Sequence, residues 1–126
     1  MGSVAMDNEW LGFYFPDELT MFELLGVVRL ESEEGFWEYE ITDQYQITLR
    51  LSFNFIEKYF QTVLSANGRV LQSANQDGVW TLHTLISGGT TALRAEAHYD
   101  GSFTTVDIFW KPNIRVSWRS ALTAVY

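Results

Sequence analysis

Apolar and polar residues alternate along much of this chain. Every second residue from Ile47 to Phe55 is apolar, and the residues between them are Thr, Arg, Ser and Asn. Trp37, Tyr39 and Ile41 alternate in the same way with two glutamates. Because successive side chains of a strand point to opposite faces, each set of apolar residues would lie on one face. The pattern predicts strands over residues 37–41 and 47–55.

Residue pairs suited to tight turns divide the rest of the chain at regular intervals. Four such pairs lie 10, 11 and 12 residues apart, and Asn-Gly, Asp-Gly and Gly-Gly supply the positive φ angles of two-residue hairpins. Strands separated by turns at this spacing are typical of antiparallel folds. The turns are Asn67-Gly68, Asp77-Gly78, Gly88-Gly89, Asp100-Gly101 and then Lys111-Pro112-Asn113, and the strands between them span 60–66, 69–74, 79–87, 91–99, 102–110 and 114–118. We expect a mainly β fold, an antiparallel meander forming a sandwich or a barrel, with α+β as the alternative.

One short helix is predicted near the N-terminus. Pro16 suits a first helical turn, Asp17 can cap the free N–H groups, and Gly26 can end the helix in a left-handed conformation. Leu19, Phe22 and either Leu25 or Met21 would form its apolar side. A strand is the competing interpretation here, because residues 10–15 are aromatic and suit an extended conformation.

Length and composition set the class of molecule. The 126 residues suit a single domain over 1–126, and 47% are hydrophobic. There is no cysteine, so disulfides and thiolate chemistry are excluded. The formal net charge of −8 argues against nucleic-acid binding, which depends on Lys and Arg. No apolar run approaches the roughly 20 residues of a membrane helix, and no signal peptide is visible. We expect a cytoplasmic protein with no membrane association.

The negative charge is concentrated in the first third of the chain. Residues 1–43 hold 11 of the 16 acidic residues and one base, Arg29, so their net charge is −10. Residues 44–126 carry a net charge of +2. The densest part, from Glu31 to Asp43, has six acids, no base and three aromatic residues. Such a surface speeds encounter with a basic partner and repels acidic ones.

This acidic segment is the candidate partner site. Tryptophan and tyrosine are frequent anchors of protein interfaces, and carboxylates pair strongly with Arg. The alternative is a solvated strand face that keeps the protein soluble, with the aromatic residues in the core. The predicted partner-binding residues are Glu31, Glu33, Glu34, Trp37, Glu38, Tyr39, Glu40 and Asp43.

The sequence offers little support for catalysis or for a bound metal. His98 shares a predicted strand face with Glu96 and Arg94, as an acid–base pair or as a surface charge ladder. The two histidines do not have metal-ligand spacing, and no calcium-loop, nucleophile-elbow or phosphate-loop motif is present. The segment from Gly88 to Thr91 lacks the lysine and the helix of a phosphate cradle, so a hairpin turn is expected. We expect no catalytic residues, no metal and no cofactor.

Small size, acidity, the absence of cysteine and the segment from Glu31 to Asp43 together resemble the immunity proteins of bacterial polymorphic toxin systems, including contact-dependent growth inhibition. The resemblance implies a complex with a basic toxin domain, often a nuclease, whose active site or exosite is covered. It identifies no individual residues. Three other functions stay open: a secretion chaperone or adaptor, a small barrel binding an apolar ligand, and an enzyme at His98 and Glu96. The oligomeric state is open as well.

Overall fold

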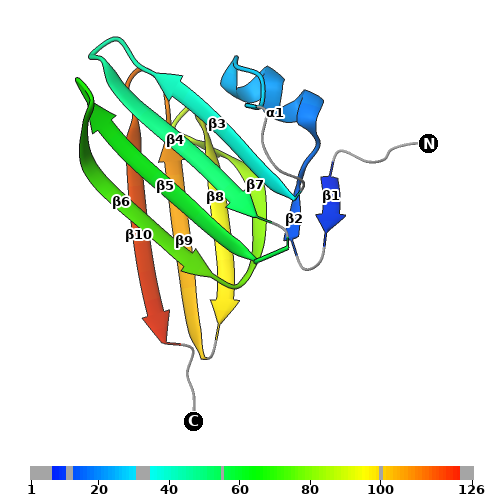
Figure 1. The fold of residues 1–126 in the computed structure, drawn as a ribbon. Coiled ribbons are helices and arrows are strands. Elements are labelled where there is room, and N and C mark those ends of the chain that lie inside the picture. Colours follow the sequence, from blue (N-terminus) through cyan, green and yellow to red (C-terminus); the bar gives the residue numbers. More distant parts are fainter. Residues whose placement is uncertain (1–6, 11–12, 31–34, 55, 100, 123–126) are drawn as a thin grey trace.

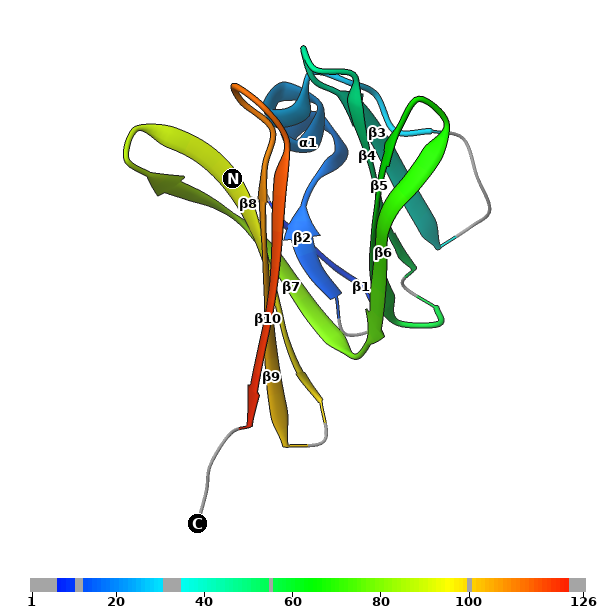
Figure 2. The same ribbon diagram turned by 90° about the vertical axis from the view of Figure 1, so that its left-hand side faces the viewer.

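Two layers of β-sheet make up the molecule, with one short helix at one end. The computed structural model describes residues 7–10, 13–30, 35–54, 56–99 and 101–122. Figure 1 shows one sheet in front of the other, with the helix beside β3. In the view turned by 90°, the two layers stand side by side (Figure 2). This arrangement confirms the mainly β prediction with one N-terminal helix.

Each layer is a separate open sheet. The six-stranded sheet has the order β1-β2-β7-β8-β9-β10, and the four-stranded sheet has the order β3-β4-β5-β6. The fold is therefore a sandwich rather than a closed barrel. All pairings are antiparallel except that between β2 and β7. The elements are β1 (Asp7–Trp10), β2 (Phe13–Pro16), α1 (Glu18–Leu25), β3 (Phe36–Thr42), β4 (Ile47–Asn54), β5 (Tyr59–Ala66), β6 (Arg69–Asp77), β7 (Val79–Ser87), β8 (Thr90–Tyr99), β9 (Ser102–Phe109) and β10 (Arg115–Leu122).

Three of the predicted turns join antiparallel neighbouring strands, at Asn67-Gly68, Gly88-Gly89 and Lys111-Pro112-Asn113, and one pair has another role. In the remaining predicted turn, Asp100 lies outside the described residues, and strands β8 and β9 pair antiparallel as expected. Asn67 and Gly68 both have positive φ angles between β5 and β6, as the mirror-image hairpin turn requires. Gly88 and Gly89 do the same between β7 and β8. The prediction for Asp77-Gly78 is wrong, because β6 and β7 belong to different sheets. That pair forms the corner at which the chain crosses the sandwich.

The helix forms where predicted, but it buries a different side. The carboxylate of Asp17 accepts a hydrogen bond from the backbone N–H of Thr20 at 2.8 Å, and Gly26 ends the helix with φ of 78°. Met21 and Leu25, which the prediction gave as alternatives, both enter the core. The remaining predicted apolar positions, Leu19 and Phe22, are exposed. The extended interpretation is correct for β2 (Phe13–Pro16), and the helical interpretation is correct for α1, which follows it.

Alternation along the strands builds the core between the layers. Leu49, Leu51 and Phe53 of β4 are all buried, as their period of two predicted. On the facing sheet, β8 contributes small residues beside large ones, and Ala97 lies opposite Trp80 in the register. Aromatic rings connect the layers, since the Phe60 and Trp80 ring centroids are 4.9 Å apart. Large and small side chains thus fill the space between the sheets.

Polar contacts also cross between the layers. The Trp118 indole N–H on β10 donates to the Thr62 hydroxyl on β5 at 2.9 Å. The Thr104 hydroxyl on β9 donates to the side-chain oxygen of Gln76 on β6, also at 2.9 Å. Buried polar groups with partners fix how the two sheets align.

Candidate functional site

The acidic face of β3 is the part of the predicted partner site that the structure describes. Glu38 and Glu40 lie on the same side of β3, and Arg50 of β4 stands beside both, 3.3 Å from each carboxylate. Side-chain exposure is 42% at Glu40 and 17% at Glu38. The two carboxylates are therefore partly neutralised within the fold. An exposed ion pair such as that between Arg50 and Glu40 contributes only about 1 kcal/mol or less, so a partner can exchange it.

The two predicted aromatic anchors have different surroundings. Trp37 is half-buried, packs at 6.0 Å from the Phe53 ring, and carries the Arg29 guanidinium 4.7 Å from its own ring centroid. Tyr39, two residues further along the same face, is 1% exposed and belongs to the core. Trp37 can therefore be reached from the surface beside Arg29, whereas Tyr39 cannot.

The buried hydroxyl of Tyr39 is unusual. Among the described residues it has no hydrogen-bond partner. Burial raises the pKa of this phenol far above its ordinary value, the carboxylate of Glu18 raises it further, and the Arg29 guanidinium opposes the shift. Tyr39 therefore stays neutral at all physiological pH values.

Asp43 ties the β3–β4 turn to the start of β10. One carboxylate oxygen accepts backbone N–H groups of Tyr45 at 2.8 Å and Ile47 at 3.0 Å, and the other accepts that of Ile114 at 2.9 Å. These hydrogen bonds, that from Ile114 most of all, lower the pKa of Asp43. The carboxylate is thus engaged in holding two loops together. Glu31, Glu33 and Glu34 lie outside the described residues.

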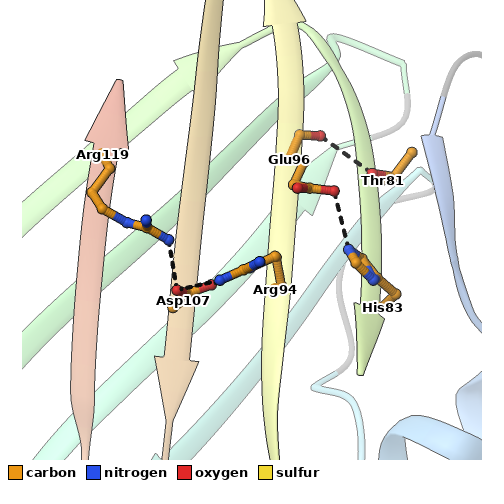
Figure 3. A network of polar contacts seen from close by, with 6 residues as sticks. All are labelled: Thr81, His83, Arg94, Glu96, Asp107 and Arg119. Carbon is orange, nitrogen blue, oxygen red and sulfur yellow. Dashed lines mark hydrogen bonds and ion pairs between the residues drawn. The ribbon is translucent and has the colours of Figure 1, made fainter. Parts of the chain in front are cut away.

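A second polar network, which sequence reasoning did not find, covers the outer face of β7 to β10. Asp107 points outward from β9 but is only 8% exposed, because the side chains of Arg94 and Arg119 lie over it. Arg94 donates two hydrogen bonds to it at 2.7 and 3.0 Å, and Arg119 donates one at 2.7 Å (Figure 3). The Arg94 hydrogen bonds are the main cause of the lowered pKa of Asp107.

The histidine of this face that pairs with Glu96 is His83. Its Nε2 atom lies 3.1 Å from Glu96 Oε1 (Figure 3), whereas the ring of His98 packs against Phe103 with centroids 4.7 Å apart. His98 and Glu96 share a strand face, as expected. The Gly88-Gly89 turn was the signal that could have located the pair, because it sets the register between β7 and β8. On this open surface the pair forms part of a charge ladder.

The described residues give no positive sign of a metal site. They contain no group of three or more His, Asp or Glu arranged to hold an ion. Two surface cavities of about 460 and 300 Å³ meet at Trp110, Lys111 and Pro112. Gly89 to Thr91 border the larger one as part of the β7–β8 hairpin, beside Glu23. Within the same part of the chain, no helix combines the length and the apolar character that crossing a bilayer requires.

Comparison with known proteins supports the fold and leaves the family open. No family model matches this sequence, and no curated protein matches it. Among solved structures, a chain of the contact-dependent growth inhibition toxin–immunity protein complex from Klebsiella pneumoniae 342 is similar, with a TM-score of 0.79. The match covers 90% of this chain and 100% of that chain, at 13% sequence identity. The resemblance predicted from the sequence is thereby confirmed at the level of the fold, which this chain shares with a member of a toxin–immunity complex.

Proposed function

We propose that this chain is an immunity protein that binds a toxin domain of a contact-dependent growth inhibition system and neutralises it without catalysis. The observation that carries the proposal is the structural likeness, which spans nearly the whole of both chains. A shared architecture over that extent is more specific than a shared sheet or hairpin. The protein would act in the cytoplasm, where an incoming toxin reaches its target.

The charge distribution favours a basic partner. Residues 1–43 carry a net charge of −10, and a concentration of negative charge attracts Lys-rich and Arg-rich surfaces. In a nuclease, such residues bind substrate phosphates, so carboxylates can take the phosphates' place. The proposed mechanism is therefore coverage of a toxin active site or exosite by the acidic segment.

Within this segment, we assign the contact to the residues that a partner can reach. Among the described residues these are Glu38 and Glu40 on the acidic face and Trp37 on the opposite side of β3. Glu31, Glu33 and Glu34, which lie outside the described residues, stay in the proposed contact as the sequence predicted. Arg50 would exchange its exposed ion pairs for those of the partner at little cost. Tyr39 and Asp43 support this surface from within the fold.

Co-expression tests the proposal directly. A candidate toxin domain, sought in the genes that neighbour this chain's gene, is induced in a bacterial host, with or without this chain. Growth arrest by the toxin alone, and growth restored by this chain at equal toxin levels, is the expected result. The purified pair should also form a complex that weakens as salt is raised. Arrest that persists despite abundant folded chain would refute the proposal.

A further inference from the structure

The outward side of α1 exposes large apolar residues that no described part of the chain covers. Leu19 and Phe22 are 65% and 44% exposed, and Val28, just beyond the helix, is 67% exposed. The opposite side of the helix, with Met21 and Leu25, is already buried in the core. Clustered rather than scattered apolar exposure of this kind is typical of an interaction surface.

These residues form a groove with a polar rim. The cavity measures about 410 Å³ and is lined by Glu18, Leu19, Phe22, Val28 and Arg29; we refer to it as the α1 groove. Arg29 Nε lies 3.3 Å from Glu18 Oε2, so the two charges at the rim are paired. The groove is large enough for one or two apolar side chains of a partner.

The α1 groove lies at the free edge of β3, on the side of the strand that carries Trp37. Leu30, directly after Arg29, donates its backbone N–H to the Glu38 carbonyl at 2.8 Å. Arg29 itself lies over Trp37, and Figure 1 shows α1 beside β3. Because β3 is an edge strand, a partner that covers this edge can reach the groove on one side of the strand and the carboxylates of Glu38 and Glu40 on the other.

The charge around the groove favours a basic occupant. Asp17 and Glu18 lie at the start of α1, Glu23 lies on its exposed surface, and the eight helical residues include no base. Arg29 is the single base among residues 1–43 and is already paired with Glu18. An apolar segment with flanking Lys or Arg would match both the groove and its surroundings.

We propose that the α1 groove is the apolar anchor site for the toxin: it receives a segment of the toxin domain that carries one or two apolar side chains flanked by Lys or Arg. This inference rests on the proposed immunity function. The acidic face of β3 attracts the toxin, and the α1 groove holds it. Apolar anchors in desolvated pockets commonly dominate affinity, while charges set the rate of association.

A matched pair of double variants tests the proposal. The chain offers the same two residue types at nearly the same exposure on β6, where Val70 is 65% and Leu71 60% exposed. The test variant is Leu19→Gln with Val28→Thr, and the control is Leu71→Gln with Val70→Thr. Strands β3 and β6 are opposite edges of their sheet, so the control lies away from the α1 groove. All four side chains are exposed, so both variants should fold.

The measurement is the affinity of each purified chain for the toxin domain encoded beside its gene. We expect the test variant to bind about 10- to 100-fold more weakly, mainly through faster dissociation, and the control to stay within about twofold of wild type. If the wild type binds tightly and the test variant binds equally well, the α1 groove is not the anchor site, but the proposed immunity function still stands. No binding by wild type would overturn both.

Sedimentation of the chain without toxin tests whether a second copy of this chain, rather than the toxin, occupies the α1 groove. We expect the same monomeric mass for the wild type and the test variant. A wild-type dimer that the test variant loses would assign the α1 groove to a second copy of this chain and overturn the proposal.

Discussion

At the scale of single residues, Tyr39 shows how a side chain that fits an interface can instead belong to the core. Alternation placed Tyr39 on the same face of its strand as Trp37 and Ile41, and that assignment was correct. The sequence could not tell how far along this face the burial extends. Trp37 remains partly accessible, whereas Tyr39 lies in the core of the sandwich with its hydroxyl unpaired among the described residues.

Replacing Tyr39 with phenylalanine should stabilise the fold. The substitution removes a buried hydroxyl that lacks a partner and keeps the ring, so we expect the free energy of unfolding to rise by about 1 kcal/mol. Denaturant unfolding measures it, with Tyr45→Phe as the control, since Tyr45 is 66% exposed and should show no change. A loss of stability in Tyr39→Phe would mean that a bound water satisfies the hydroxyl.

At the scale of elements, the strands and turns were largely predictable, whereas their assignment to sheets was not. Asn67-Gly68 and Gly88-Gly89 specify hairpins through backbone conformation alone, which a short sequence encodes fully. The corner at Asp77-Gly78 uses the same residue types, but the layer in which the next strand pairs depends on contacts distant in sequence. The exposed side of α1 escaped prediction for the same reason, because periodicity does not say which apolar residues meet a neighbour.

One carboxylate, that of Asp107, holds together the polar network on the outer face of β8 to β10. Asp107 receives hydrogen bonds from Arg94 on β8 and Arg119 on β10, so it links three neighbouring strands. We expect Asp107→Asn to lower the free energy of unfolding at neutral pH by about 2 kcal/mol, as for other hydrogen bonds to charged groups. Asp77→Asn, at an exposed position on β6, is the matched control and should have little effect.

The same carboxylate predicts a pH dependence. The pKa of Asp107 is lowered in the folded state, so its contribution is complete above the unfolded value of about 4 and is lost as pH falls through the folded value. Wild type should therefore lose more stability on acidification than Asp107→Asn, and their difference should shrink at low pH. A constant difference across this range would argue against the ion pairs as its source.

At the scale of the whole molecule, negative charge is concentrated in residues 1–43, whereas the rest of the chain is nearly neutral. The sequence alone revealed that asymmetry, since it depends only on composition along the chain. It did not reveal Arg50 between Glu38 and Glu40, because cross-strand neighbours follow from the register of β3 with β4. Nor could it show the α1 groove, because the groove forms only when α1 and the segment with Val28 and Arg29 are folded next to each other.

Reversing charge on β3 should alter the kinetics of binding more than the fold. In Glu38→Lys with Glu40→Lys, two lysines would face Arg50, and we expect slower association with the toxin domain and a flatter salt dependence. Stopped-flow association at several ionic strengths measures both. The control is Glu57→Lys with Asp77→Lys, which changes the net charge equally at two other exposed positions. Equal slowing in both variants would point to net charge rather than to this face.

Strand β6 has a consequence for how the protein behaves when it is concentrated. As an edge of the four-stranded sheet, it offers unpaired backbone groups on which further chains can add and form aggregates. Its most apolar stretch, Val70-Leu71, coincides with the shift in register against Leu64 and Ser65, where the strand is least regular. Arg69 and Asp77 place charges at its two ends. We therefore expect this edge to be a poor template for aggregation at high protein concentration.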